Sequence, residues 1–438
     1  MKDNYSRPVP SGRFSRMAHM GGLVTRVASG MVAEGARQLA SGNRPIARDL
    51  LLTPANVRRV AEKLSHLRGA AMKLGQLLSM DAGDLMPPEL AELLATLRAG
   101  ATPMPMLQLA GVLEENLGAD WQDQFQQFGF SPIAAASIGQ VHRALDLHGN
   151  SLAIKIQYPG IAKSIDSDVD NVISLLKISR LLPKGVIADE LVEEAKLQLH
   201  AEADYMLEAG HLKEYRQLLS DDNRFRVPVY YPELSSRNLL SMSFESGVPV
   251  ESLLEYPLAE RNRCAELLLS LLFRELFEFK RVQTDPNFAN FMYDPETSQL
   301  VLLDFGATRE YGSDLVEAYR QLFAAGLQQD REGLLQAATR IGYFNKEITS
   351  SQQHAVLQLF ELAMEPLRAE RYDFGSTDLA RRLRDQGMEL SLQEGYWHSP
   401  PVDALFLHRK LAGLYLLFAR LKVSLACRDI LQPWLKLD

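Results

Sequence analysis

Apolar side chains recur at helical spacing in the first hundred residues. The clearest stripe lies within residues 53–80, at Val60, Leu64, Leu67, Ala71, Leu74 and Leu78. Thr53 and Pro54 suit the start of this helix, because a capping hydroxyl precedes a proline at the first helical position. A second helix is predicted over residues 89–98. We therefore expect a helical N-terminal extension over residues 1–105.

The apolar period changes from helical to alternating near residue 128. Alternation predicts four short strands, at residues 138–144, 152–157, 227–231 and 238–244. Helical patterns interrupt them, as an amphipathic insert at residues 161–182 and a longer run at residues 189–219. This order predicts a small antiparallel sheet crossed by one helix, in a domain that spans residues 106–247.

Beyond residue 247 the pattern is mostly helical. It breaks at residues 282–304, where a loop and a hairpin are predicted, and residues 310–438 are helical again. A sheet-rich part followed by a helical part, residues 248–438, indicates an α+β fold with two lobes.

The break at residues 282–304 carries the most specific chemistry of the chain. Asp285 is followed five residues later by Asn290, and an apolar strand then ends in Asp304 of an Asp-Phe-Gly triplet. In phosphoryl-transfer sites, one aspartate orients the attacking group, the asparagine ligates Mg²⁺, and the second aspartate bridges the metal and the phosphates of ATP. Each motif alone also fits a turn or a strand end. Their order, downstream of a strand lysine, favours an ATP site.

That lysine is Lys155, in the alternating run LAIKIQ, where it would reach the α- and β-phosphates. The alternative is a lysine that faces solvent. A covered lysine needs an acidic partner. The helical run at residues 189–219 offers Glu202, Asp204 and Glu208, and spacing does not choose among them.

A cluster of small residues precedes the lysine strand. It comprises Ala134, Ala135, Ala136 and Ser137. A phosphate-cradling turn needs small side chains so that backbone N–H groups approach the oxygens. Alanines meet this size requirement but give less backbone freedom than the glycines of a GxGxxG loop.

The composition narrows the class of protein. Net charge is −8 and 46% of the residues are hydrophobic, which indicates a folded soluble protein without general nucleic-acid affinity. Residues 1–50 hold eight basic and three acidic residues, compatible with contact to an anionic membrane surface or with a solvated arm. The two cysteines lie far apart, and the chain has no 18-residue apolar run and no secretory signal. We expect a cytoplasmic protein without disulfides, zinc or a membrane span.

Six motifs stand out together: KLGQ (73–76), AAASIGQVH (134–142), AIKIQYPG (153–160), EADY (202–205), QTDPNFANF (283–291) and LLDFGATREY (302–311). They resemble the UbiB family of atypical protein-kinase-like proteins, the coenzyme Q-associated kinases, over residues 9–421. The resemblance implies a two-lobed protein-kinase-like fold with an N-terminal helical extension and extra C-terminal helices. It also implies ATP and Mg²⁺ as cofactors.

The resemblance gives roles to the chemical residues. The catalytic set would be the nucleotide lysine Lys155, its partner Glu208, the catalytic aspartate Asp285, and the metal ligands Asn290 and Asp304. Residues 134–137 would cover the phosphates. Adenine would rest against the backbone near Ser243 and Glu245.

A regulatory set also follows from the resemblance. On pattern alone, Lys73 and Gln76 are neighbours on a solvated face of the helix at residues 53–80. In the family they belong to the KxGQ helix, which folds over the active site. Glu202 and Asp204 would be the acidic pair that holds Lys73.

The chain departs from ordinary protein kinases before Asp285, where Gln283 and Thr284 replace His and Arg. A helix that plugs the peptide site argues further against large protein substrates. The resemblance favours an ATP-binding, Mg²⁺-dependent atypical kinase or ATPase that supports ubiquinone biosynthesis, with slow basal turnover. The alternatives are a small-molecule phosphotransferase and an ATP-gated lipid or quinone chaperone. Expected partners are the nucleotide, a prenyl-quinone precursor or lipid, quinone-biosynthesis enzymes and, peripherally, an anionic inner membrane.

Overall fold

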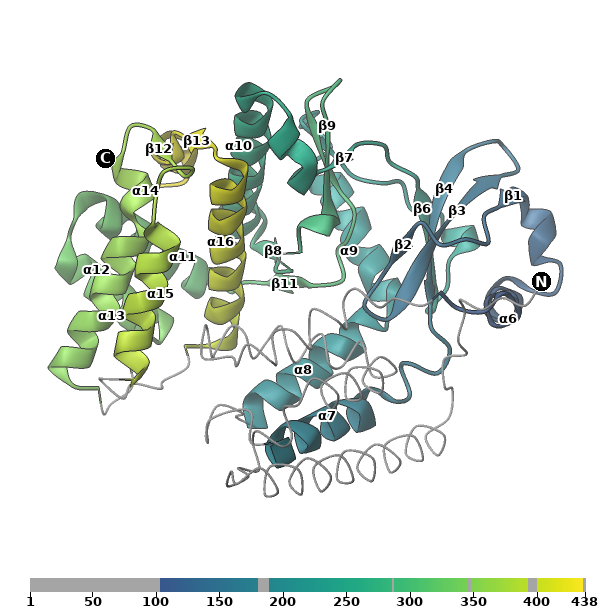
Figure 1. Ribbon diagram of the computed structural model, residues 1–438, viewed down its shortest axis with the longest axis horizontal. Coiled ribbons are helices and arrows are strands. Elements are labelled where there is room, and N and C mark those ends of the chain that lie inside the picture. Colours follow the sequence, from purple (N-terminus) through teal and green to yellow (C-terminus); the bar gives the residue numbers. More distant parts are fainter. Residues whose placement is uncertain (1–102, 180–188, 286, 345–347, 393–399, 436–438) are drawn as a thin grey trace, which may run out of the picture. The chain divides into compact units, whose positions relative to one another are not determined.

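The computed structural model describes residues 103–179, 189–285, 287–344, 348–392 and 400–435 (Figure 1). The predicted helices before residue 103, with Lys73 and Gln76, lie outside the described residues. The chain divides into two compact units. Unit 1 comprises Met1–Ala209 and Val229–Phe244, and unit 2 comprises Gly210–Pro228 and Glu245–Asp438. Our single boundary after residue 247 assigned residues 210–228 to the first lobe, whereas they belong to unit 2.

An antiparallel sheet forms the core of unit 1, as predicted. Its strands are β1 (Phe125–Phe128), β2 (Ala134–Ala135), β3 (Gly139–Asp146), β4 (Ser151–Gln157) and β6 (Leu239–Ser243). The order is β1-β3-β4-β6, and β2 also pairs with β3. All residues of β4 after Ser151 are buried, so the strand that carries Lys155 is covered on both faces.

The prediction of a strand at residues 227–231 was wrong. These residues form no ladder, and Tyr230 makes a single isolated bridge with Met242. Pro228 and Pro232 flank the bridge. Proline has no N–H group to donate, so a regular ladder does not extend through these positions.

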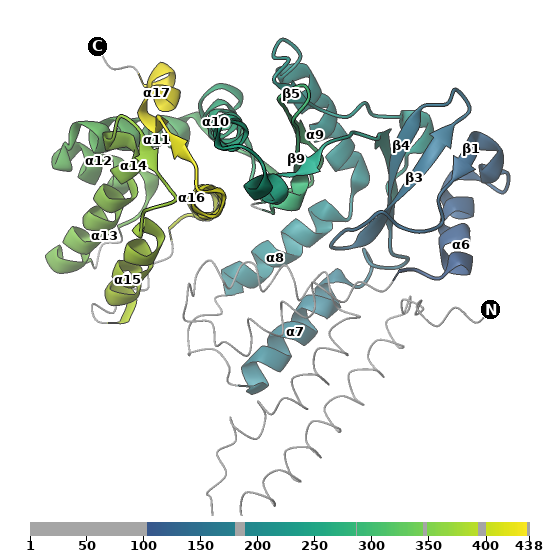
Figure 2. The same cartoon turned by 45° about the horizontal axis from the view of Figure 1, so that its top comes forward.

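The described helices of unit 1 are α6 (Met106–Leu117), α7 (Ile165–Ser179), α8 (Asp189–Glu202) and the start of α9 (Tyr205–Leu218), with short turns η3 (Trp121–Gln124) and η4 (Pro232–Leu234). Helices α7 and α8 lie side by side (Figures 1 and 2). Lys196 pairs with Asp170 at 2.9 Å and His200 with Asp166 at 2.9 Å, so the two helices run antiparallel.

The single helix predicted over residues 189–219 was also wrong, because the chain breaks between α8 and α9. At the break, the Tyr205 amide donates to the carbonyl of Arg237 at 3.1 Å. The Asp204 carboxylate accepts from the Met206 amide at 3.1 Å, as an N-terminal capping residue does. Glu202 ends one helix and Glu208 lies in the first turn of the next.

Unit 2 is mostly helical, as predicted. Its helices are α10 (Leu258–Arg274), α11 (Ser313–Gln328), α12 (Arg331–Ile341), α13 (Ser350–Ala363), α14 (Glu365–Arg368), α15 (Leu379–Leu392), α16 (Val402–Leu421) and α17 (Cys427–Leu431). Short turns η5 (Val250–Glu255), η7 (Phe288–Asn290) and η8 (Gln432–Trp434) join them. Helix α10 continues into a π-helical turn, η6 (Glu275–Phe279). π-Helical turns are rare in proteins, but those that occur are often found at functional sites.

Three small sheets complete unit 2. One has the order β5-β10-β9-β7, from β5 (Phe225–Arg226), β7 (Val248–Pro249), β9 (Phe291–Asp294) and β10 (Gln299–Leu302). The others pair β8 (Arg281–Gln283) with β11 (Thr308–Glu310), and β12 (Tyr372–Asp373) with β13 (Ser424–Leu425). The β9–β10 hairpin confirms the hairpin predicted within residues 282–304.

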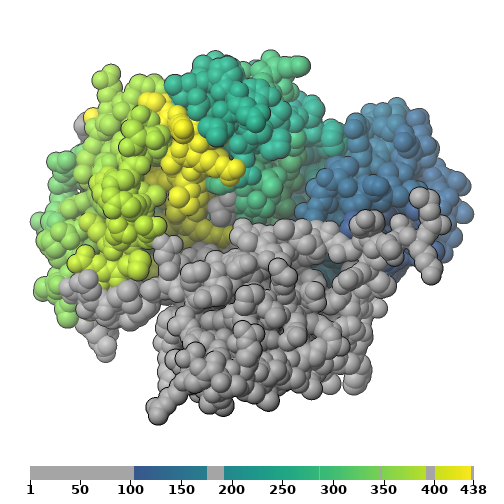
Figure 3. All heavy atoms as spheres, viewed as in Figure 1, coloured from purple at the N-terminus to yellow at the C-terminus, as the bar shows by residue number. Residues whose placement is uncertain are grey.

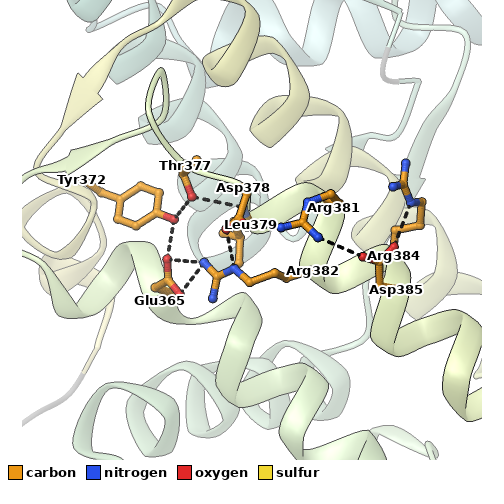
Figure 4. A network of polar contacts seen from close by, with 9 residues as sticks. All are labelled: Glu365, Tyr372, Thr377, Asp378, Leu379, Arg381, Arg382, Arg384 and Asp385. Atoms are coloured by element: carbon orange, nitrogen blue, oxygen red, sulfur yellow. Dashed lines mark hydrogen bonds and ion pairs between the residues drawn. The ribbon is translucent and has the colours of Figure 1, made fainter.

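The C-terminal helices form one packed group in unit 2. In the space-filling view, residues of α16 (yellow) lie between those of α10 (teal-green) and the yellow-green helices α13–α15 (Figure 3). At the start of α15, Arg382 pairs with Glu365 at 2.8 Å and with Asp378 at 2.7 Å, and Thr377 accepts from the Leu379 amide (Figure 4). Among the described helices, none combines the length and the apolar character needed to cross a membrane.

Candidate active site

In unit 1, Lys155 forms a buried ion pair with Glu208. The Lys155 ammonium donates to both carboxylate oxygens, at 2.9 and 2.8 Å. The lysine is 8% exposed and the glutamate 2%. Burial of either charge alone would cost several kcal/mol, so each group depends on the other. The geometry selects Glu208 from the three acidic residues that spacing left open.

The other two acidic candidates have different partners. Ser137 donates through its hydroxyl to Glu202 at 2.9 Å. Asp204 pairs with Arg237 at 3.0 Å. The expected contact of this acidic pair with Lys73 stays a prediction, because Lys73 lies outside the described residues.

Close packing holds the strand lysine in place. The Lys155 ammonium lies 5.3 Å from the centre of the Tyr205 ring, in a cation–π contact with a fully buried tyrosine. Gly139 allows this approach. A Cβ atom at this position would lie 2.3 Å from the Ile156 carbonyl oxygen and 2.9 Å from the Tyr205 hydroxyl. Only glycine therefore fits between the small-residue turn and the lysine strand.

The alanine cluster forms a hairpin on the same sheet. Ala134 pairs with Val141, and Val141 pairs with Lys155 on the next strand. Residues directly opposite each other in antiparallel pairs point to the same face, so these three side chains share one face of the sheet. Ala134 and Ala135 are exposed, and the Ala136 amide donates to the Gly139 carbonyl at 2.9 Å across the turn. Ser137 follows within this turn.

The predicted adenine positions lie where β6 ends. The Ser243 hydroxyl accepts from the Val229 amide at 2.8 Å. Glu245 pairs with Arg226 at 3.3 Å. Both side chains bind other protein groups, which agrees with contact to adenine through their backbone atoms only. That role remains a proposal.

In unit 2, Asp285 and Asn290 contact each other directly. The Asn290 amide nitrogen donates to Asp285 Oδ2 at 3.2 Å, and Asp285 Oδ1 accepts from the Asn287 backbone at 3.2 Å. The Asn287 side chain caps η7 by accepting from the Ala289 amide. We call residues 284–290 the Asp285 loop. Its own hydrogen bonds orient the aspartate.

The hairpin brings Asp304 next to this loop. Phe291 pairs with Leu302 at the base of β9 and β10, and the Leu303 amide donates to the Asn290 carbonyl at 2.9 Å. Asn290 and Asp304 therefore flank the same open end of the hairpin. Asp304 Oδ1 accepts from the Gly306 amide at 2.9 Å, which fixes the carboxylate at the strand end.

The phenylalanine of the Asp-Phe-Gly triplet is fully buried. Phe305 packs against Tyr215, with ring centres 4.9 Å apart. Burial of the hydroxyl and the nearby negative charge of Glu275 raise the pKa of Tyr215 well above its usual value. Tyr215 therefore remains a neutral hydrogen-bond donor, and the segment after Asp304 is anchored in the core of unit 2.

One charged neighbour of the site was not predicted from the sequence. Arg409, on α16, lies 3.6 Å from Asp285 Oδ1. A signal was present in the sequence, because His408, Arg409 and Lys410 interrupt a mostly apolar stretch. Helical periodicity alone does not show which distant segment such residues meet.

Comparisons with known proteins agree with this geometry. The family described as ABC1 atypical kinase-like domain matches residues 96–338. Atypical kinase COQ8B, mitochondrial, from Rattus norvegicus is 39% identical over 97% of this chain and 81% of that protein. Atypical kinase COQ8, mitochondrial, from Saccharomyces cerevisiae is 37% identical over 97% of this chain and 85% of that protein.

A solved structure, the Rv3197–erythromycin complex from Mycobacterium tuberculosis, has the same fold. Its TM-score is 0.59 at 23% identity, over 84% of this chain and 92% of that one. The predicted α+β, protein-kinase-like fold and the UbiB resemblance are both confirmed. By its motifs, its relatives and its fold, this chain belongs to the ABC1 atypical kinase-like family and is an atypical kinase.

Proposed function

We propose that this chain binds ATP with Mg²⁺ and acts as a slow atypical kinase or ATPase in support of ubiquinone biosynthesis. The observation that carries the proposal is the buried pair of Lys155 and Glu208, at 2.8 Å. Binding to phosphate oxygens would explain why a charged lysine lies on a buried strand. The similarity to atypical kinases of the coenzyme Q-associated family supports the proposed role in ubiquinone biosynthesis.

The residues of each unit would have distinct tasks. Lys155 would bind the α- and β-phosphates, and Glu208 would orient it. Residues 134–137 would cover the phosphates, and the backbone near Ser243 and Glu245 would support adenine. Alanines restrict this hairpin more than glycines would, which supports slow turnover.

The donor set formed by Asn290 of the Asp285 loop and by Asp304 fits Mg²⁺. This ion commonly takes one or two carboxylates together with nucleotide oxygens, and Asn290 and Asp304 supply one amide and one carboxylate. The Asn290 nitrogen donates to Asp285, which leaves its amide oxygen for a cation. When bound, Mg²⁺ would neutralise charge on the β- and γ-phosphates.

Asp285 would orient the attacking hydroxyl or water and take up its proton. In the transfer, the new bond to the γ-phosphorus would form as its bond to the oxygen that bridges the β- and γ-phosphates breaks, and ADP would leave with that oxygen. Arg409 contacts Asp285 and keeps its carboxylate beside a positive charge. We further propose that a quinone precursor or lipid and an anionic membrane are partners, on the basis of the basic residues among positions 1–50.

An Asp304→Asn variant tests the metal role. We expect wild type to gain thermal stability with MgATP and Asp304→Asn to lose this gain, because the carboxylate charge is gone. Asp294→Asn is the matched control, since Asp294 lies in the same hairpin and pairs with Arg226 at 3.0 Å. An unchanged MgATP response in Asp304→Asn would contradict the proposed role.

A further inference from the structure

A buried ion pair lies directly behind the Asp285 loop. Lys410, on α16, donates to Glu275 at 2.7 Å and to the backbone carbonyl of Gln283 at 2.6 Å. Glu275 accepts from the Gln283 amide at 3.3 Å and from the Tyr215 hydroxyl at 2.8 Å. Glu275 is 0% exposed and Lys410 3%. The pair thus holds both backbone polar groups of Gln283, two residues before Asp285.

Stability alone does not explain why charged residues occupy these positions. Replacing a buried ion pair with apolar side chains of similar volume is often neutral or stabilising. Apolar side chains would not, however, hydrogen-bond the Gln283 backbone. The charged pair therefore adds hydrogen bonds to Gln283, in the chain that leads into the loop, which apolar side chains would not supply.

The backbone around Glu275 favours its hydrogen bond with Gln283. Glu275 is the first residue of the π-helical turn that follows α10, and Lys280 ends that turn in a left-handed conformation, with φ of 53°. Strand β8 starts at the next residue and carries Gln283 back along Glu275. The turn therefore places a carboxylate beside the strand that enters the Asp285 loop.

We propose that Lys410 and Glu275 are positioning residues for phosphoryl transfer, because they fix Gln283 and so the direction of Asp285. This inference rests on the function proposed above for Asp285. Helix α16 lies beyond residues 96–338, the part matched by the family domain. The Asp285 loop of this chain thus depends on its C-terminal region.

Two variants separate positioning from packing. Lys410→Met removes the ammonium and leaves Glu275 buried without its charge partner. Lys410→Met/Glu275→Leu removes both charges, so thermal stability should return toward that of wild type. We expect kcat for ATP to fall roughly tenfold or more in both variants, because small misplacements of a catalytic group are costly. KM for MgATP should stay within about twofold of wild type, since the binding residues are intact.

Arg382→Met is the matched control. It breaks the ion pairs of Arg382 with Glu365 and Asp378 in the same unit, and both partners are outside the Asp285 loop (Figure 4). Because these pairs are partly exposed, this variant should lower the melting temperature by at most a few degrees, and it should leave kcat unchanged. Recovery of kcat together with stability in the paired apolar variant would show a packing role only and would overturn the proposal.

Amide hydrogen exchange of residues 281–285 in the nucleotide-free protein gives a second readout. Both Lys410 variants should exchange faster than wild type in this peptide, whereas Arg382→Met should not. Unchanged exchange in the paired apolar variant would overturn the positioning role. If wild type shows no Mg²⁺-dependent ATP turnover, the proposed function fails, and the exchange result still decides whether the pair holds the loop.

Discussion

Each unit of the molecule contains a buried lysine–glutamate pair beside the residues assigned to phosphoryl transfer, and the two pairs differ in construction. In unit 1, Lys155 donates to both oxygens of Glu208 from the middle of a strand. In unit 2, Lys410 divides its hydrogen bonds between Glu275 and a backbone carbonyl. The first pair orients a charged side chain, and the second orients a stretch of backbone.

The two buried ion pairs, each of which costs desolvation free energy, therefore have different roles. Buried ion pairs add little net stability over apolar residues, so their retention is best explained by a task. On our account the ammonium of Lys155 would bind phosphate, whereas that of Lys410 binds the backbone carbonyl of Gln283. The pairs should therefore respond alike in stability measurements and differently in nucleotide binding.

The largest expected effect comes from breaking either pair on one side. Lys155→Met and Lys410→Met should each lower the free energy of unfolding by about 3–5 kcal/mol, because a buried carboxylate loses its partner. Only Lys155→Met should abolish the thermal response to MgATP. Denaturant unfolding and thermal shift, measured on the same samples, check both parts.

Lys196→Met is the control for the loss of a lysine. Its pairs with Asp170 and Glu193 lie at the surface, so the change should cost less than about 1 kcal/mol. An effect on stability equal to that of Lys155→Met would contradict the distinction between buried and exposed pairs.

A smaller effect is expected from crowding the first pair. Gly139→Ala places a Cβ atom against the Ile156 carbonyl and the Tyr205 hydroxyl and should cost about 3 kcal/mol. Gly111→Ala is the matched control, because Gly111 lies in α6 with nothing within 4 Å of the added atom, and alanine should stabilise the helix by up to about 1 kcal/mol. Equal effects at the two positions would show that the close approach at Gly139 is unimportant.

The sequence predicted the first pair far better than the second. Strand alternation predicted that Lys155 lies on a strand, and the family resemblance, not the spacing, predicted Glu208 as its partner. The break after Glu202 was not predicted, since the helical pattern continues through it and the competing hydrogen bond comes from Arg237, which is distant in sequence.

Arg409 and Lys410 were missed for a similar reason. Their partners lie far away along the chain, and local periodicity carries no information on which segments meet. The π-helical turn at Glu275 was also beyond prediction, because its residues continue the apolar pattern of α10. The contacts of the site that join distant segments are therefore known only from the structure.

The smallest predicted effect concerns pH and the helix of the second pair. Burial lowers the pKa of His408 to about 4, next to Tyr319 and Tyr343. The unfolded chain binds this proton below about pH 6.5 and the folded chain does not, so stability falls as pH decreases from 6.5 toward 4. From pH 7 to pH 5 the loss should be about 2 kcal/mol.

Denaturant unfolding at several pH values checks this prediction. His408→Gln should flatten the dependence, because glutamine does not titrate. Burial also lowers the pKa of His142 in unit 1, so part of the slope should remain. A slope identical to that of wild type in His408→Gln would show that α16 contributes nothing to the acid sensitivity.

The most direct test of the account is the affinity for MgATP of a folded protein that lacks the charges of the first pair. Lys155→Met/Glu208→Leu keeps an apolar core in unit 1 and removes the phosphate-binding ammonium. Calorimetric titration should show MgATP binding to wild type and to the corresponding Lys410→Met/Glu275→Leu variant, and none to this one. Binding of wild-type strength to Lys155→Met/Glu208→Leu would contradict the assignment of Lys155 to the nucleotide.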